Sequence, residues 1–398
     1  MSYDKPTLSD TQTLKRARTM LQEHLRLEAH GYSCQSEHLY DVLLGASAHQ
    51  ESIEALCLRM PSMPSADTVR RHLKGQLTIE KLPEIEQGIN EALGADLPKR
   101  LRRSARKRGL RIAIDFHDRP YYGKAPEDEA LWVRAKAKDG TTRFLRVATA
   151  YVIHRGLRLT LALRFVRPED TTVGVVEHLR RWLETLDMPI QYLLLDKGFS
   201  GIAVLKYLEA QQVPAIIACP IRGKKDPEPS ATRALCQGRK SYWATYTFSN
   251  AETSFTAQLA VCRVFTTSKR TGRMQRRGTW HIFIVLGEAL QACAAQAIKR
   301  LYRDRFGVET SYRLSGQVRA WTTSPNAAYR FVLMALSFLM INVWIHLCWL
   351  FTQVARRGGR WLDVERFRLR RYAKFIEQAL ERKYGCIQQI VAPAVPLL

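Results

Sequence analysis

The sequence predicts a mixed α/β fold, in which a strand-rich central region is preceded and followed by helical regions. Two observations carry this prediction. Apolar residues recur at helical spacing through residues 1–98, whereas beyond Leu110 short apolar strands alternate with amphipathic helices. The chain has 398 residues, of which 46% are hydrophobic and 9% aromatic. This composition is enough for packed cores and for two or three domains.

The charge balance predicts a polyanionic partner. The chain carries 62 Lys and Arg against 37 Asp and Glu, a formal net charge of +25. Arginine forks match phosphate oxygens, so nucleic acid is the favoured partner, and DNA the expected one. The eight cysteines show no CxxC pair and the N-terminal stretch lacks an apolar signal core. We therefore expect reduced thiols and a cytoplasmic location.

Residues 1–109 are predicted to be an N-terminal helical, DNA-binding domain with a basic linker. Residues 52–60 and 66–75 look like two helices joined by the turn PSMPS. They form either a helix-turn-helix that presents Arg70, Arg71 and Lys74 to DNA, or a plain bundle with a solvated basic face. The linker KRLRRSARKRG, with seven basic residues in eleven, is suited to contact a phosphate backbone.

Residues 110–219 are predicted to form the first part of the catalytic core. Three apolar strands come first: LRIAIDFH, FLRVATAYVI and LRLTLALRFV. A helix, the strand QYLLLD, a second helix and the strand PAIIAC follow. This succession is the element order of a ribonuclease-H-like core.

The remaining chain is divided into three parts by its pattern. Residues 220–287 are expected to be a β-rich insertion, residues 288–352 the second part of the core, and residues 353–398 a basic helical C-terminal tail. Residues 331–351 contain no Asp, Glu, Lys or Arg and are long enough to span a membrane. A helix buried on all sides gives the same pattern and is the favoured interpretation, so no membrane partner is expected.

Three carboxylates are candidates for catalysis and metal binding. Asp115 and Asp196 stand at or near the ends of apolar strands, and Glu309 lies on a later predicted helix. If the three converge, divalent cations would offset their repulsion, and hard oxygen ligands select Mg²⁺, or Mn²⁺ in its place. The alternatives are a turn or helix cap for each Asp and a salt bridge on the helix for Glu309. Asp118 competes with Asp115, which is favoured because it belongs to the apolar strand.

The stretch LYRDRFGVETSYR places Tyr302, Arg305, Glu309 and Tyr312 on one stripe of a helix. Core stripes are normally apolar. This stretch, together with the segments LLLDKGFS around Asp196 and IAIDFHDRPYYG around Asp115, makes the chain resemble insertion-sequence transposases of the Asp-Asp-Glu type. The group it resembles (IS-four-like) has the signature Tyr, two residues, Arg, three residues, Glu, six residues, Lys. The resemblance covers roughly residues 110–345 and includes a β-rich insertion before the Glu.

The resemblance implies Asp115, Asp196 and Glu309 as metal ligands, with Tyr302 and Arg305 beside the cleaved end of the element's DNA. The signature Lys would fall at position 316, where this chain has glycine. Arg313 and Arg319 are the candidates for the DNA contact of that missing Lys.

The predicted function is cleavage of element ends and their joining to target DNA by two-metal phosphoryl transfer. A metal-activated water would free a 3′-OH, which then attacks the target in line, without a covalent enzyme intermediate. A homodimer is expected by analogy, because two ends are cut. The alternatives are another ribonuclease-H-like DNA nuclease, a non-catalytic DNA-binding protein derived from a transposase, and an integral membrane protein.

Overall fold

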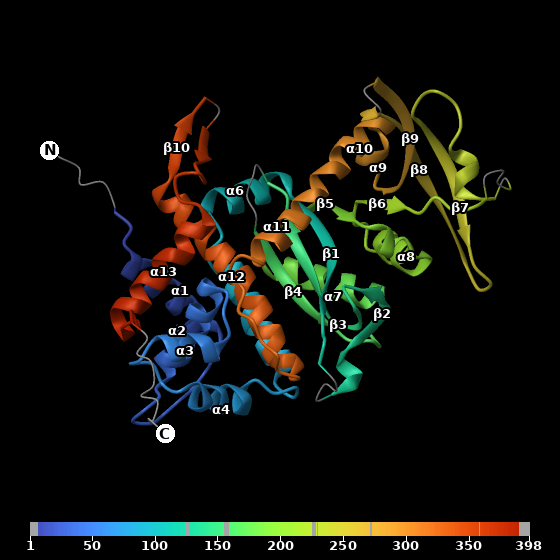
Figure 1. Ribbon diagram of the computed structural model, residues 1–398. Coiled ribbons are helices and arrows are strands. Elements are labelled where there is room, and N and C mark those ends of the chain that lie inside the picture. Colours follow the sequence, from blue (N-terminus) through green and yellow to red (C-terminus); the bar gives the residue numbers. More distant parts are fainter. Residues whose placement is uncertain are drawn as a thin grey trace. The chain divides into compact units, whose positions relative to one another are not determined.

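The computed structural model (Figure 1) describes residues 7–123, 128–154, 159–224, 228, 230–270, 273–357 and 359–389, with backbone only for 266–270, 273–277, 356 and 359. The chain divides into two compact units. Unit 1 comprises Met1–Pro98, Asp118–Arg146 and Ser311–Leu398. Unit 2 comprises Lys99–His117 and Val147–Thr310. Each unit is described by itself below.

Unit 1 is mainly helical. Its helices are α1 (Asp10–His24), α2 (Ser36–His49), α3 (Ile53–Arg59), α4 (Ala66–Gln76), α5 (Leu82–Ala95), α12 (Ala327–Phe351) and α13 (Leu369–Tyr384). Ser9, Ser52 and Ser65 precede α1, α3 and α4, and each side-chain oxygen accepts a hydrogen bond from a backbone N–H of the first turn. These caps explain where the three helices begin, because they satisfy donors that have no partner within the helix. The two helices predicted at residues 52–60 and 66–75 are confirmed as α3 and α4.

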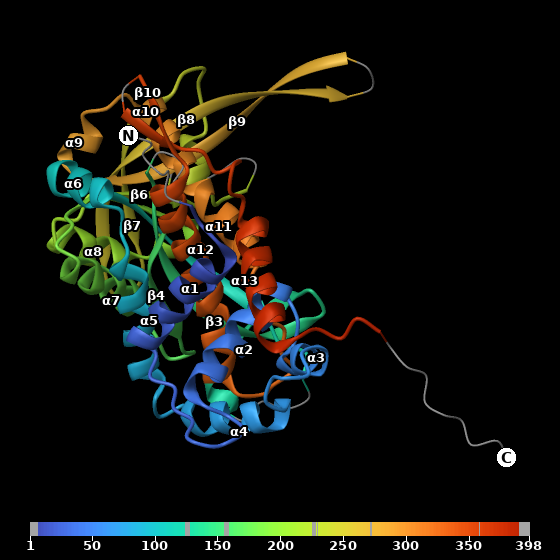
Figure 2. The same ribbon diagram turned by 90° about the vertical axis from the view of Figure 1, so that its left-hand side faces the viewer.

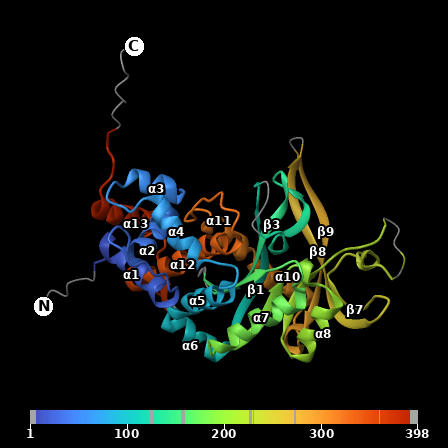
Figure 3. The same ribbon diagram turned by 90° about the horizontal axis from the view of Figure 1, so that it is seen from below.

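Helix α12 is the core of unit 1. It packs against α1, α2, α5 and α13, which surround it in Figure 3. The helix passes a length and composition test for a membrane span, but 94% of its most apolar window is buried inside the structure. The prediction of a helix buried on all sides is therefore confirmed.

The polar residues of α12 are satisfied by the surrounding backbone. The Asn342 amide donates to the carbonyl of Leu93 (3.2 Å), and the Trp344 indole donates to that of Phe367 (2.6 Å). The Ser337 hydroxyl donates to the Met334 carbonyl one turn back (2.6 Å). These groups fix the packing of α12, since burying them without partners would be costly.

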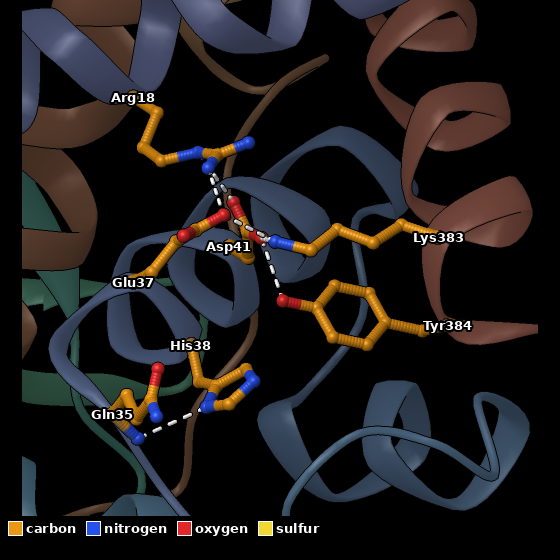
Figure 4. A network of polar contacts seen from close by, with 7 residues as sticks. All are labelled: Arg18, Gln35, Glu37, His38, Asp41, Lys383 and Tyr384. Carbon is orange, nitrogen blue, oxygen red and sulfur yellow. Dashed lines mark hydrogen bonds and ion pairs between the residues drawn. The ribbon is translucent and has the colours of Figure 1, made fainter.

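A buried ionic network joins α2 to α13 and α1 (Figure 4). Asp41 is fully buried, and it accepts hydrogen bonds from Lys383 Nζ (2.9 Å) and Tyr384 Oη (2.7 Å). Arg18 on α1 lies 3.0 Å from the other oxygen of Asp41 and also contacts Glu37, as does Lys383. The network ties the C-terminal helix α13 to the N-terminal helices of the chain.

Unit 2 is built on a mixed sheet, of which residues 118–120 of β1 and 141–146 of β3 are assigned to unit 1. Its strands are β1 (Leu110–Pro120), β3 (Thr141–Val152), β4 (Thr160–Val166), β5 (Ile190–Leu195), β6 (Ala215–Cys219), β7 (Tyr242–Ser249), β8 (Ser254–Arg270) and β9 (Arg273–Leu286). The sheet order is β3-β1-β5-β6-β9-β8-β7, with β4 paired to β3. The β-rich region predicted at residues 220–287 thus extends the same sheet, and Figure 2 shows its long β8–β9 hairpin.

The helices of unit 2 connect and cover these strands. They are α6 (Lys99–Arg108), α7 (Thr172–Thr185), α8 (Ile202–Ala210), α9 (Glu288–Gln291) and α10 (Ala295–Arg303), followed by the first turn of α11 (Gly307–Ser315). Helix α7 packs on β4 and on α8, and α10 packs on β7, β8 and β9. The basic run expected as a linker forms α6, because Leu101 and Ala105 give it a buried side.

Strands β1 and β5 are parallel neighbours, and Ile114 pairs with Leu195. Gly109 precedes β1 with φ +74°, and a Cβ there would lie 2.6 Å from the backbone nitrogen of Gln191. Only glycine accepts both the backbone angle and the close approach. This glycine therefore allows β1 to enter the sheet directly beside β5.

The structure differs from the predicted elements in three places. Strand β2 (Val133–Lys138), which pairs with the start of β3, was not predicted, because its alternating charges resemble a loop. Residues 353–362, expected to be helical, form the hairpin β10 (Gln353–Arg356) and β11 (Gly359–Leu362). The helix expected from 289 to 315 is divided by a 3-10 turn at Asp304–Phe306.

Candidate active site

Asp115 and Asp196 lie side by side because of the strand register. Ile114 on β1 pairs with Leu195 on the parallel strand β5. Asp115 directly follows Ile114, and Asp196 directly follows Leu195. Both side chains therefore stand at the carboxyl end of the apolar part of the sheet, where α/β proteins commonly place their sites.

Arg305 brings the predicted acidic residues together. Its Nη1 donates to Asp115 Oδ2 at 2.8 Å, and its Nη2 lies 3.9 Å from Asp196 Oδ1. Glu309, one turn further along the chain, places its Oε1 3.8 Å from the same Nη2. The guanidinium thus lies within ion-pair distance of three carboxylates that come from three different elements.

The electrostatics of the cluster are those of acids gathered around too little positive charge. Burial raises the pKa of Asp115, and the nearby Asp196 raises it further, while Arg305 opposes both effects. The side chains of Asp196 and Glu309 are 38% and 52% exposed, so they face solvent more than Asp115 does at 17%. One guanidinium offsets one charge of three, which leaves a net negative site.

The alternative roles of the aspartates can be compared with the geometry. Asp196 occupies the N-cap position of a 3-10 turn at Lys197–Phe199, but its side chain makes no capping hydrogen bond. Asp118 is held by Arg146 through two hydrogen bonds, of 2.6 and 2.8 Å, within unit 1. Asp118 is therefore fully engaged by an arginine of its own, whereas Asp115 belongs to the cluster around Arg305.

The carboxylates are arranged around the guanidinium rather than around a point that a metal could occupy. Among the described residues, no group of three or more His, Cys, Asp or Glu side chains is close enough to hold a metal ion. The donor set nevertheless consists of hard carboxylate oxygens around a single cation, which is the chemistry that Mg²⁺ prefers. The three carboxylates fit a divalent ion if the Arg305 guanidinium moves away from its place between them.

Tyr302, which is expected beside the cleaved end of the DNA, is buried in this structure. Its ring is 8% exposed and packs 4.7 Å from the ring of Phe283. Its hydroxyl donates to the Leu195 carbonyl at 3.2 Å, directly before Asp196, and the Arg305 guanidinium lies 5.6 Å from the ring centroid. In this structure Tyr302 positions β5 and Arg305, and stacking on a nucleotide stays a prediction.

The other residues predicted to contact DNA lie in unit 1. Arg71, Lys74 and Arg313 are exposed. Arg70 is paired with Glu54 and Asp67, both at 2.5 Å, and Arg319 is partly buried. Gly316 follows Arg313 near the end of α11 without a left-handed backbone angle. The role of Arg313 or Arg319 in place of the signature Lys stays a prediction.

Sequence reasoning missed an aromatic pair beside the cluster. Phe116 and Phe199 stack with ring centroids 4.8 Å apart and planes 8° from parallel. Each follows one of the two aspartates closely in the sequence, so their proximity follows from the same strand register. The signal was present in DFHD and DKGFS, but it has meaning only once β1 and β5 are known to be neighbours.

Comparison with solved structures shows that the mixed α/β fold of this chain is similar to a fold already known. One such structure is the cryo-EM structure of the piggyBac transposase synaptic complex with hairpin DNA. Its TM-score is 0.54 at 10% sequence identity, over 97% of this chain and 80% of that chain. No family model matches the sequence. No curated protein matches it either.

Proposed function

We propose that this protein is a DNA transposase of the Asp-Asp-Glu type that cuts the ends of an insertion sequence and joins them to target DNA. The observation that carries the proposal is the convergence of Asp115, Asp196 and Glu309 on the Arg305 guanidinium. Three acids from a strand, a strand end and a later helix have no packing reason to meet. A shared role in catalysis explains why these three acids lie close together.

The sheet supports a ribonuclease-H-like core for this enzyme. In the sheet the strands lie in the order β4-β3-β1-β5-β6, and β1, β5 and β6 are parallel. Along the chain, β1, β3 and β4 come first, and β5 and β6 follow, each after a helix. The net charge of +25 and the fold similarity to piggyBac transposase point in the same direction. The sequence signature of the insertion-sequence group supports the narrower assignment.

We assign Asp115, Asp196 and Glu309 as ligands of Mg²⁺, with Mn²⁺ as a substitute. When bound, two such ions supply activation of the attacking oxygen and stabilisation of the leaving one. Asp115 would be the fixed ligand, because the Phe116 amide holds its second oxygen at 3.0 Å. Glu309 and Asp196, which are more exposed, would adjust to the ions.

The proposed reaction has two steps. Water attacks the phosphorus at the element end, the bond from phosphorus to the 3′ oxygen breaks, and that oxygen leaves as a 3′-OH. The 3′-OH then attacks a target phosphorus and displaces the target's own 3′ oxygen. Arg305, once released from the carboxylates, would neutralise charge on the phosphoryl oxygens. We further propose that a homodimer does this in the cytoplasm.

The test is an assay of the purified full chain on DNA carrying candidate element ends, with Mg²⁺, Mn²⁺ or chelator. We expect metal-dependent nicking that leaves a 3′-OH, followed by joining to a plasmid target. Glu309→Gln should lower both activities by at least a thousandfold, because a ligand is lost while the size is kept. Glu209→Gln, on the exposed side of α8, is the matched control and should behave as wild type.

Cleavage without metal, or full activity of Glu309→Gln, would overturn the site assignment. Metal-dependent cleavage with no joined product would instead identify a nuclease. Product analysis on sequencing gels separates these results.

A further inference from the structure

Unit 1 contains a large basic pocket outside the candidate active site. It occupies about 1220 Å³ between α3, α4, the end of β1 and the segment from Arg319 to α12. Small-molecule sites commonly enclose about 300–1,000 Å³, so this pocket is wide enough for part of a polymer. The basic side chains that line it are Arg70, Lys74, Arg119, Arg319 and Arg330.

The pocket carries positive charge that its own acids do not neutralise. Glu54 and Asp67 also line it, but both are engaged by Arg70. Within the described part of the chain, neither Arg119 nor Arg319 forms an ion pair with a carboxylate. Burial lowers the pKa of both, to about 10 for Arg319, and the nearby charge of Arg119 lowers the pKa values of Arg319 and Arg330 further. Partly buried cations in this state favour an anion between them.

Arg330 forms the fixed wall of the pocket. Its guanidinium donates to the carbonyls of Ser324 (2.5 Å) and Thr322 (3.2 Å). It also lies over the rings of Tyr121, at 4.8 Å, and Trp132, at 5.8 Å. Because its donors are used in this way, Arg330 holds the loop before α12 in place and adds long-range positive potential.

Two large aromatic side chains stand exposed at the same pocket. Trp321 is 67% exposed and Tyr122 is 66% exposed. The backbone N–H of Trp321 donates to the Glu51 carbonyl (3.0 Å), so the chain holds the indole at this position. Exposed aromatics beside unpaired arginines are the combination with which proteins bind unstacked nucleobases and their phosphates.

We propose that this pocket binds an unpaired nucleotide of DNA, with its backbone phosphate on Arg119 and Arg319 and its base stacked on Trp321. The inference rests on the proposed function, in which the protein binds and cuts DNA ends. Duplex DNA could place only phosphates here, since its bases are already stacked. The pocket therefore distinguishes single-stranded or unpaired segments from duplex.

The experiment measures binding by fluorescence anisotropy with the full chain in chelator. The probes are a labelled 12-nucleotide thymidine oligomer and a duplex of equal length. The variants are Arg119→Gln, Arg319→Gln and Trp321→Ala. The control is Arg181→Gln on α7, which makes the same charge change at a site where the arginine is paired with Glu177.

We expect Trp321→Ala to weaken binding of the single strand about tenfold and to leave duplex binding nearly unchanged. Trp321→Phe should restore most of the loss. Arg119→Gln and Arg319→Gln should each reduce the slope of log affinity against log salt by about 0.7. Since Trp321 is mostly exposed, its variants test the proposal even if an arginine variant fails to fold.

The proposal would be overturned if Trp321→Ala bound the single strand with the same affinity as the wild-type protein. It would also be overturned if Trp321→Ala lost as much affinity for the duplex as for the single strand. A third contrary result would be that thymidine monophosphate displaces the labelled oligomer at the same concentration as unlabelled oligomer does. The last result would mean a free nucleotide as ligand. The binding assay contains no metal, so it is independent of the cleavage assay with Mg²⁺. Binding of the single strand as expected, without any cleavage, would refute the proposed enzyme and keep the pocket. Cleavage without the expected effect of Trp321→Ala on binding would refute the pocket and keep the enzyme.

Discussion

Arg305 determines the state of the candidate active site at the scale of single residues. Its side chain is 9% exposed and its Nη1 donates to Asp115, so the pair is held away from solvent. Removing one member of such a pair leaves the other charge buried, which costs far more than the pair itself contributes. The guanidinium therefore keeps the three carboxylates together as long as no metal does.

We predict that Arg305→Gln lowers the free energy of unfolding by about 3 kcal/mol in metal-free buffer. The reason is that Asp115 loses its cation while Asp196 continues to repel it. Urea denaturation followed by tryptophan fluorescence measures the change. Mg²⁺ should stabilise this variant more than wild type, since the ion takes over the role of the guanidinium.

Arg181→Gln serves as the control, because it removes an exposed arginine from the same unit. We expect it to stay within about 0.5 kcal/mol of wild type. Equal stability of Arg305→Gln and wild type, or an equal response of both to Mg²⁺, would contradict the role given to Arg305.

The sequence could predict Asp115 and Asp196 because each ends an apolar strand, and Glu309 because of its spacing from Arg305. It could not predict that Arg305 lies within ion-pair distance of both aspartates, since that depends on the distance between separate elements, and the DNA contact of Arg305 stays a prediction. The pocket residues Arg119 and Trp321 were missed for a related reason. They come from segments that share no local pattern, and only the fold brings them together.

At the scale of elements, periodicity predicted most of the architecture. The strands β1, β3, β4, β5 and β6 and the helices α7 and α8 were expected in this order, and the structure confirms them. The sequence predicts helix where the structure forms the hairpin of β10 and β11, because the charged residues around it resemble the basic helix α13 that follows. The glycine pair in RRGGR is the turn signal that should have outweighed the charge pattern.

We predict that Asp41→Asn destabilises unit 1 by about 3 kcal/mol, whereas Tyr384→Phe costs about 1 kcal/mol. The first change removes the buried anion that Lys383 and Arg18 surround, and the second removes one hydrogen bond of 2.7 Å. Thermal unfolding followed by circular dichroism measures both.

The order of the two effects is the decisive result. If Tyr384→Phe cost as much as Asp41→Asn, the attachment of α13 would depend on the tyrosine rather than on the ionic network. If neither mattered, apolar packing of α13 against α1 and α2 would be sufficient.

At the scale of the whole molecule, charge dominates the chemistry. The net charge of +25 is spread over both units, and within unit 2 the helix α6 carries seven basic residues and buries Leu101 and Ala105. A phosphate backbone that binds such a surface releases counterions, so affinity must fall steeply with salt. This holds for the proposed transposase and for a non-catalytic DNA-binding protein alike.

We predict that raising KCl from 50 to 200 mM weakens duplex binding by about a thousandfold, as for a protein that neutralises about six phosphates. Arg103 and Lys107 are exposed on α6, and replacing both by glutamine should reduce the slope of log affinity against log salt by about 1.8. Arg181→Gln should leave the slope unchanged, because that arginine is already paired with Glu177. A slope that the α6 double variant does not change would place the duplex elsewhere on the molecule. In that case the helical form of this basic run would reflect its packing against the rest of unit 2 rather than a role in holding DNA.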